Sequence, residues 1–315
     1  MARTPVPEAA RRLALAALAS VLAAGAWAQS IGVLLSDGDA ARLAGMEVRA
    51  AELEGVELVI EDAAPDVAAQ VERIGALAAA GAEAVVVHAV DPARAADLTD
   101  AAEAAGLALV FVGSEPINLG SLPEGQAFVT SDEVESATLA AFEACRLLRA
   151  SGKASGARGY MLMGPLADGV AVQRAKDVRD VIGMDMCSFV TLLDERSANG
   201  SREEAAALIG KLVASGEPFD VIFASDDAMA LGALDAISEG GMDPATIVVS
   251  GIGATEEGLA AVEAGALDAT VLRDDEGQGG AALDAALALA RGEAAGPVIH
   301  VAFRLVTRET LDGGE

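Results

Sequence analysis

The sequence predicts an α/β fold of two similar domains, each with a parallel sheet that helices cover on both faces. Short apolar runs typical of strands alternate with helical patterns along the chain. This order is typical of parallel sheets. The order runs through twice in 315 residues, and the length that follows the N-terminal segment suits two domains of ordinary size.

The first domain is expected to contain five strands with helices between them. The strands are predicted at residues 31–35, 56–60, 84–87, 107–112 and 127–130, and the helices at residues 40–53, 66–80 and 92–105. The second helix carries its apolar residues at helical spacing, as Val67, Val71, Ile74 and Leu77. Gly81 ends that helix as a C-cap glycine.

The pattern then starts again along the rest of the chain. In this second run, helices are predicted at residues 132–150, 169–182, 201–214, 229–237, 256–263 and 279–290. Its strands are predicted at residues 159–163, 187–192, 221–223, 246–250 and 269–272, and a last extended segment at residues 298–306.

Polar side chains and glycines recur where the predicted strands end, namely at Asp37, His88, Ser114, Asp226 and Gly253. Ligands bind at this edge of open α/β sheets, because strand ends leave a crevice and helix amino ends present free N–H groups. If the two domains face each other, these positions line one cleft. Asp226 and Asp227 separate a strand from a helix, so they either face a ligand or only cap the helix.

The N-terminus has the pattern of a secretory signal peptide at residues 1–28. A basic start precedes the apolar run 13–27, and Ala26-Trp27-Ala28 is a small-x-small cleavage site. The apolar run is too short to span a membrane, and no later segment is long enough. We therefore expect an exported chain that begins near Gln29 and is not inserted in the membrane.

The chain is strongly acidic, with a formal charge of −28. Without the predicted signal peptide, which has three arginines and one glutamate, the charge becomes about −30. Nucleic acids and anionic membranes should repel such a protein.

The only two cysteines are Cys145 and Cys187. In an oxidising compartment they either form a disulfide or remain two buried thiols. No histidine and cysteine cluster has metal-ligand spacing, and His88 and His300 each stand alone. No metal or cofactor is expected.

Five segments resemble the type I periplasmic solute-binding proteins, in particular the sugar-binding branch and its galactose/glucose-binding members. They are the helix at 70–74 with the following Gly81, VDP at 90–92, VFVGSEP at 110–116, ASDDAMALGA at 224–233 and EGLAAVEAGALDATVLRDD at 257–275. The resemblance extends over nearly all the chain after residue 28.

This resemblance implies two Rossmann-like lobes joined by a three-strand hinge. The N-terminal lobe would comprise residues 29–131 and 274–301, and the C-terminal lobe residues 132–273 and 302–315. Such proteins are monomers that capture a small polar solute between the lobes by hinge closure. They deliver it to an inner-membrane ABC permease from the periplasm, or present it to a sensory receptor or kinase. The ligand would be a sugar, a polyol or a sugar acid.

The resemblance also assigns candidate ligand-binding residues. Arg174 and Asp226 fall on binding positions of the family, and Asp168 falls where galactose/glucose-binding members have a histidine. Most other hexose-binding positions are replaced, at Ala40, Gly113, Val170, Gly253 and Arg273 and at a residue near Ser201. The loop 151–158 lacks the acidic ligands of the family's calcium loop, so no calcium is predicted there.

The loss of both aromatic stacking positions weakens a hexose as the ligand and leaves Phe111 as the one candidate aromatic. Arg174 and Arg273 could instead hold a carboxylate or phosphate by two parallel hydrogen bonds, or they pair with Asp168 or Asp226. Asp37 and Asp39 either bind ligand or cap a helix, and His88 either binds ligand or is a hydrogen-bonded residue near the hinge. No Ser–His–Asp order, nucleophile elbow or metal set is present, so we do not expect an enzyme.

Overall fold

The computed structural model describes residues 29–62 and 64–313, so the predicted signal peptide lies outside the described residues. The chain divides into two compact units. Unit 1 contains the described residues up to Val129 together with Asp275–Ile299, and unit 2 contains Thr130–Asp274 and the described residues from His300 onward. The chain therefore passes between the units three times.

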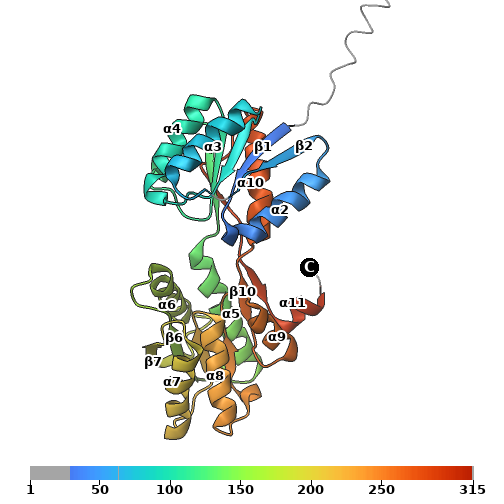
Figure 1. Cartoon of the computed structure of the whole chain (residues 1–315). Helices are drawn as coiled ribbons and strands as arrows, with labels where there is room; N and C mark the ends of the chain where they lie inside the picture. The colour runs from blue at the N-terminus through green and yellow to red at the C-terminus, as the bar shows by residue number, and fades with distance from the viewer. Residues whose placement is uncertain (1–28, 63, 314–315) are drawn as a thin grey trace, which may run out of the picture. The chain divides into compact units, whose positions relative to one another are not determined.

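Unit 1 is built on a six-stranded sheet (Figure 1). The strands are β1 (Gln29–Leu34), β2 (Val56–Ile60), β3 (Ala84–Val87), β4 (Ala108–Val112), β5 (Gln126–Thr130) and β11 (Val298–His300), in the order β11-β5-β4-β3-β1-β2. Strands β1 to β5 pair in parallel. The predicted α/β class with parallel sheets is confirmed.

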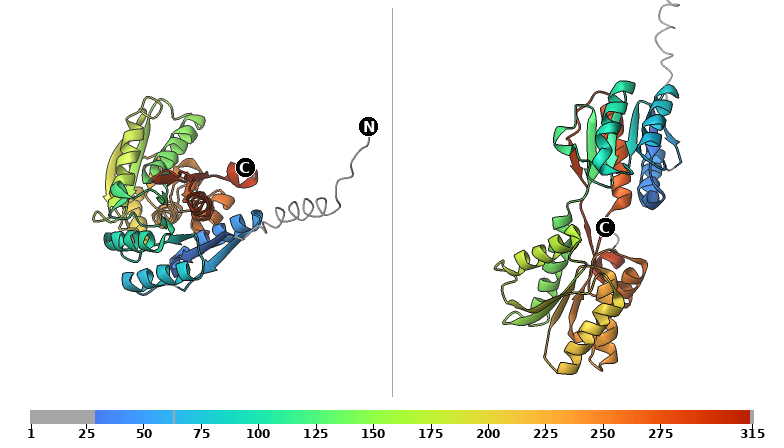
Figure 2. Two further views of the ribbon diagram at one scale, coloured as in Figure 1. Left: turned by 90° about the horizontal axis from the view of Figure 1, so that it is seen from above. Right: turned by 60° about the vertical axis from the view of Figure 1, so that its left-hand side comes forward.

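Helices cover both faces of this sheet (Figures 1 and 2). Helices α3 (Val67–Ala79) and α4 (Ala95–Ala105) pack on one face, and α2 (Ala40–Glu52) and α10 (Asp275–Ala290) on the other. Alternate residues of a strand point to opposite faces. Val85, Val87 and Phe111 therefore join Ile74 and other residues of α3 and α4 in one core.

Unit 2 has a four-stranded parallel sheet in the order β7-β6-β8-β9. These strands are β6 (Ala157–Met163), β7 (Val190–Ser197), β8 (Val221–Ala224) and β9 (Val248–Ser250). A separate antiparallel pair consists of β10 (Thr270–Leu272) and β12 (Arg304–Val306). Helices α9 (Glu256–Ala264) and α11 (Arg308–Gly313) also belong to this unit.

Two cores lie on opposite faces of the unit 2 sheet. Val221 and Phe223 of β8 belong to the core that contains residues of α5 (Glu133–Ala150) and α6 (Gly169–Ile182). Ile222, the residue between them, belongs to the core that contains residues of α7 (Arg202–Ser215) and α8 (Asp227–Glu239). The two-residue period of a strand accounts for this division.

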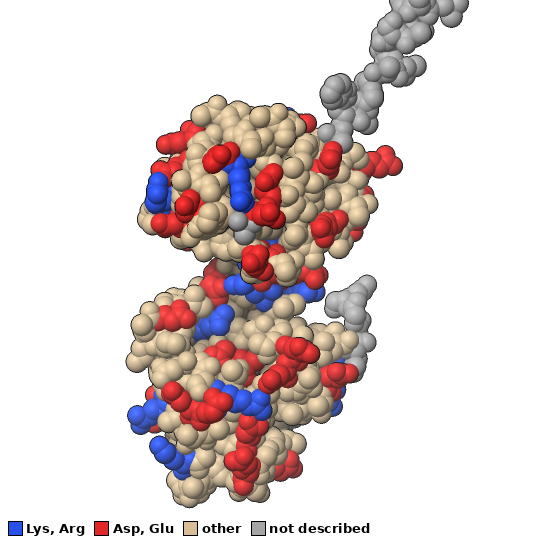
Figure 3. Space-filling model, in the orientation of Figure 1, with Lys and Arg blue, Asp and Glu red and all other residues tan. Residues whose placement is uncertain are grey.

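Acidic side chains are scattered over the visible face of each unit (Figure 3), as the charge of −28 predicts. No helix of the described part of the chain has the length and apolar character needed to span a bilayer.

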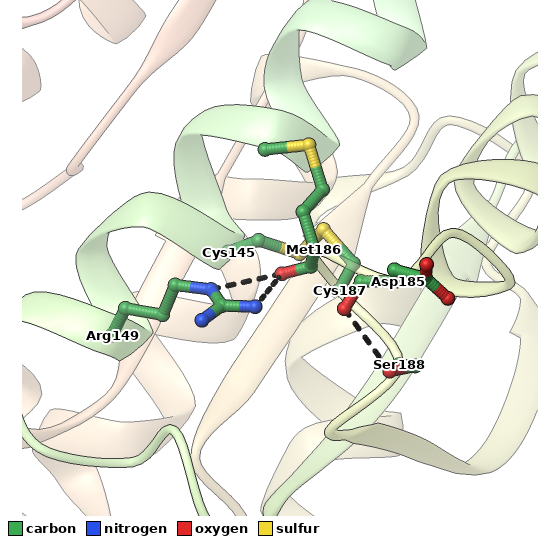
Figure 4. Close-up of a disulfide and its surroundings, with 6 residues drawn as sticks. All are labelled: Cys145, Arg149, Asp185, Met186, Cys187 and Ser188. Carbon is green, nitrogen blue, oxygen red and sulfur yellow. Dashed lines mark hydrogen bonds between the residues drawn. A yellow bond between two sulfur atoms is a disulfide. The ribbon is translucent and has the colours of Figure 1, made fainter.

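Cys145 and Cys187 form a disulfide, which decides between the two alternatives left open by the sequence (Figure 4). Cys145 lies on α5 and Cys187 in the turn before β7, with their Cα atoms 5.6 Å apart and both side chains fully buried. Arg149 of α5 donates to the Met186 carbonyl from Nε at 2.9 Å and Nη2 at 2.5 Å. The turn is thus held to α5 by the bridge and by the bonds to the neighbouring Met186 carbonyl.

Several elements differ from the prediction. The strand predicted at 187–192 begins only at Val190, because the backbone around Cys187 is hydrogen-bonded into a turn. The segment predicted at 298–306 divides into β11, which pairs in the unit 1 sheet, and β12, which pairs with β10. Helix α11 has no counterpart among the predicted elements.

Candidate functional site

Three residues predicted to bind ligand meet at one edge of the unit 1 sheet. Asp39, His88 and Ser114 follow β1, β3 and β4, and the carboxyl ends of these parallel strands lie at the same edge. The Nδ1 atom of His88 lies 2.7 Å from Oδ2 of Asp39, and its Nε2 atom lies 3.4 Å from Oγ of Ser114.

Asp39 is the centre of this group. Its side chain is 1% exposed. Oδ2 accepts from the backbone N of Ser36 at 3.0 Å and from its Oγ at 2.5 Å. Oδ1 accepts from Nη1 of Arg42 at 2.6 Å.

Arg42 connects this group to the start of α10. Its Nε donates to Oε1 of Gln278 at 2.9 Å, and its Nη2 donates to Oδ1 of Asp275 at 2.6 Å. Arg42 is buried. Asp39, Asp275 and Gln278 therefore supply the hydrogen bonds that its charge requires away from water.

The pKa of Asp39 is held well below its usual range. Burial acts to raise this pKa, but hydrogen bonds from His88 and Ser36 outweigh that effect and lower it. Asp39 is therefore a carboxylate at neutral pH.

The loop that carries His88 is held from behind by Gln70 of α3. The buried Gln70 amide donates to the His88 carbonyl at 2.7 Å and accepts from the Val90 N–H at 3.1 Å. Both bonds fix the backbone and leave the imidazole free to be oriented by its own partners.

At the corresponding edge of unit 2, Arg174 of α6 is bonded to protein groups. Its Nη1 donates to the Ser225 carbonyl at 2.9 Å, and its Nη2 lies 3.3 Å from Oε2 of Glu133. The Arg174 side chain is 20% exposed, and its Nε is buried with no hydrogen-bond partner among the described residues. The Nε–H donor of this guanidinium therefore has no partner among the described residues.

Asp226 and Asp227 have different roles after β8. Asp226 caps α8 by accepting from the Met229 N–H at 2.8 Å. Burial raises the pKa of Asp226, Asp227 adds to this, and Arg174 opposes it. Asp227 is fully buried and accepts from Oγ1 of Thr270 at 2.6 Å and from the Thr255 N–H at 2.8 Å, which makes it a structural residue.

The three other predicted ligand-binding residues, Asp37, Asp168 and Arg273, are exposed. Asp168 caps α6 by accepting from the Val170 N–H at 2.9 Å. The structure thus brings together Asp39, His88 and Ser114 within unit 1, and Arg174 and Asp226 within unit 2. Ligand contact by any of the eight candidates stays a prediction.

Sequence reasoning missed Arg42 and Glu133 as partners of the predicted residues. Arg42 follows Asp39 by three residues at a helix start, and this spacing places two side chains on one helical face, so a local signal existed. Glu133 lies far from Arg174 in the sequence, and no local signal could have found it. Among the described residues, no group of three or more histidine, cysteine, aspartate or glutamate side chains could hold a metal ion.

Comparison with known proteins places the chain in a family. A model described as a periplasmic binding protein domain matches residues 35–294. The chain is 42% identical over 267 residues to a candidate rhizopine-binding protein of Rhizobium meliloti, and the match covers 85% of each chain.

Two solved structures with bound myo-inositol are also similar. An ABC transporter solute-binding protein of Bacillus halodurans is 25% identical, with a TM-score of 0.62 and coverage of 92% of this chain and 98% of that chain. A Caulobacter myo-inositol binding protein is 26% identical, with a TM-score of 0.59 and coverage of 90% and 95%. These comparisons do not confirm the narrower resemblance to galactose/glucose-binding members. The family model and the 42% identical relative show that the chain belongs to the type I periplasmic sugar-binding proteins, which bind solutes and are not enzymes.

Proposed function

We propose that this protein is the periplasmic substrate-binding protein of an ABC importer and that its solute is a sugar, a polyol or a sugar acid. The observation that carries the proposal is the 42% identity to a candidate rhizopine-binding protein over 85% of each chain. The similarity to two proteins solved with myo-inositol adds support for a polyhydroxylated solute.

The chemistry of the two sheet edges supports the same class of solute. His88, Ser114, Arg174 and Asp226 offer hydrogen-bond donors and acceptors. Phe111, the one aromatic residue considered for stacking, is fully buried in the core of unit 1. Hydrogen bonds to hydroxyl groups, rather than ring stacking, would therefore provide most of the specificity.

Export, delivery to a permease and hinge closure around the solute complete the proposal. Export rests on the predicted signal peptide at residues 1–28, and hinge closure rests on the family resemblance. The alternative is a sensing protein that presents the same solute to a membrane receptor or kinase.

A thermal-shift screen of the chain from Gln29 onward tests solute binding. The panel is myo-inositol, a rhizopine, D-ribose, xylitol, D-galactose and D-galacturonate. A solute at about 100 times its Kd should stabilise the protein by about 2.7 kcal/mol. Titration calorimetry should then give one site per chain. A panel without any stabilising solute contradicts the proposal.

Two arginines of α6 provide a matched pair for locating the site. Arg174→Ala should weaken binding of the identified solute by about tenfold or more, since a hydrogen bond from a charged group is worth about 1.5–3 kcal/mol. Arg179 pairs with Glu195 on the surface at 3.0 Å, so Arg179→Ala should leave the Kd unchanged. An unchanged Kd in Arg174→Ala would place the solute elsewhere, and equal losses in both variants would show a general effect of removing an arginine from α6.

Uptake by whole cells separates import from sensing. Deleting the gene should abolish uptake of the labelled solute if the protein serves an importer. Normal uptake, combined with loss of the transcriptional or motility response to the solute, favours the sensing alternative.

A further inference from the structure

The two ring nitrogens of His88 have different surroundings. Nδ1 lies 2.7 Å from the buried Asp39 carboxylate, and Nε2 lies 3.4 Å from the exposed Ser114 hydroxyl. The His88 side chain is 24% exposed. One nitrogen therefore contacts a buried group, and the other lies beside an exposed residue.

The hydrogen bonds of Asp39 determine which nitrogen carries the proton. A carboxylate only accepts hydrogen bonds. The Ser36 N–H and the Ser36 hydroxyl donate to Oδ2, and Arg42 donates to Oδ1. His88 Nδ1 also contacts Oδ2, and it must be a donor because the carboxylate has no proton to give.

Arg42 holds the Asp39 carboxylate through its other oxygen. It makes an ion pair with Oδ1 of Asp39 at 2.6 Å, and both side chains are buried. Asp275 and Gln278 hold the guanidinium in place from α10.

The absence of a side chain at Gly113 lets the backbone approach the imidazole of His88 closely. A Cβ atom at residue 113 would lie 2.6 Å from Nε2 of His88. The backbone of Gly113 also has φ +78°, a conformation that residues with a side chain rarely adopt. A side chain at position 113 would therefore collide with the imidazole ring of His88 unless one of the two moved.

We propose that Asp39 and Arg42 are positioning residues that hold neutral His88 in its Nδ1–H form, so that Nε2 accepts a hydrogen bond from a hydroxyl group of the solute. This inference rests on the proposed function and narrows it. An unprotonated nitrogen attracts a hydroxyl donor and repels a carboxylate oxygen, so this position favours neutral sugars and polyols over sugar acids.

Nitrogen NMR of the histidine ring tests the protonation state without any ligand. His88 and His300 are the only histidines of the chain, so His300→Gln in protein purified without a histidine tag leaves one imidazole to observe. The spectrum is recorded at about pH 8, above the ordinary pKa of histidine. We expect a protonated Nδ1 and an unprotonated Nε2. An imidazolium, or a protonated Nε2, overturns the inference whether or not any variant folds.

Asp39→Asn then tests the positioning role. Loss of the carboxylate should shift His88 toward a mixture of its two neutral forms. Asp66→Asn is the matched control in the same unit, since Asp66 caps α3 through the Ala69 N–H and asparagine caps equally well. An unchanged His88 spectrum in folded Asp39→Asn contradicts the inference.

Addition of myo-inositol tests the role of Nε2. Binding should move the Nε2 resonance, and His88→Ala and Asp39→Asn should each raise the Kd for myo-inositol about tenfold. Binding that leaves the Nε2 resonance in place overturns the inference and leaves the proposed function intact. If no member of the solute panel binds, both the proposed function and the proposed contact between Nε2 and the solute are contradicted. The spectrum without ligand still decides which nitrogen of His88 carries the proton.

Discussion

Asp39 and Asp226 show how partners decide the charge of a carboxylate at the end of a strand. Both follow strands of parallel sheets and both were predicted to bind ligand. Hydrogen bonds from His88 and Ser36 lower the pKa of Asp39, whereas burial raises the pKa of Asp226. Their ionisation should therefore affect stability in opposite directions.

The Asp39 carboxylate should stabilise the fold at neutral pH and lose this effect in acid. Its folded pKa lies below the ordinary value of 3.8, so the stabilisation is fully present above 3.8 and decreases as the pH falls below it. Urea unfolding of wild type and Asp39→Asn should show a gap in unfolding free energy that is constant near neutral pH and narrows below about pH 4. A gap that widens in acid would contradict the assignment.

Asp226→Asn should have the opposite effect. Its raised folded pKa means that the ionised form is penalised at neutral pH, and this penalty disappears as the pH falls toward the ordinary value of 3.8. Asparagine keeps the cap of α8, so the variant should be slightly more stable than wild type at neutral pH and equal to it in acid. Thermal unfolding measured across this pH range is the check, and a variant destabilised at neutral pH would refute it.

At the scale of elements, close approach between helices and one covalent bridge determine how the elements pack. A Cβ at Gly45 of α2 would lie 1.9 Å from the Glu276 carbonyl, and one at Gly279 of α10 would lie 1.9 Å from the Arg42 carbonyl. The two helices thus touch backbone to backbone, which sets Arg42 beside Asp275 and Gln278.

Gly45→Ala should destabilise unit 1 by about 3 kcal/mol, at the upper end for overpacking, because a backbone carbonyl cannot turn aside as a side chain can. Gly75→Ala is the matched control. Gly75 lies in α3, and a Cβ there has nothing within 4 Å. That substitution should stabilise by about 0.5–1 kcal/mol, since glycine is a poor helix former. Urea unfolding measures both, and effects of the same sign would contradict the close contact.

The disulfide should contribute about 3–4 kcal/mol, because it closes a loop of 42 residues in the unfolded chain. Cys145→Ala combined with Cys187→Ala removes it and should lower the unfolding free energy by about that amount. A reducing agent should destabilise the wild type and leave the double variant unchanged. Equal sensitivity of both proteins to the reducing agent would show that the effect does not come from this bridge.

At the scale of the whole molecule, the net charge affects stability without acting through any single contact. The formal charge is −28, and acidic side chains are scattered over the visible face of each unit (Figure 3). Such a surface repels itself in the folded state.

Salt should therefore stabilise the protein. Raising the ionic strength from about 0.01 M to about 0.15 M shortens the screening length from about 30 Å to about 8 Å, so the Tm should rise over this range. Equal rises with sodium chloride and potassium chloride would indicate screening. A rise with only one of them would indicate binding of a specific ion, and a falling Tm would contradict the idea.

Periodicity and turn chemistry act over a few residues, so the sequence alone could determine the alternating elements. Helix α3 lies where the spacing of Val67, Ile74 and Leu77 predicted it. The strand around Val221–Phe223 likewise pairs in a parallel sheet, as its short apolar run indicated. The sequence also placed His88 and Asp226 within two residues of the ends of strands.

Tertiary structure decided what those side chains contact. Arg42 bonds Gln278 across 236 positions of sequence, and Cys145 meets Cys187 only because α5 and the turn before β7 pack together. Local patterns could show that Asp39 is acidic and begins a helix. Its burial, its low pKa and its bond to His88 follow from elements that only folding brings together, because the energy of a buried charge depends on every group around it.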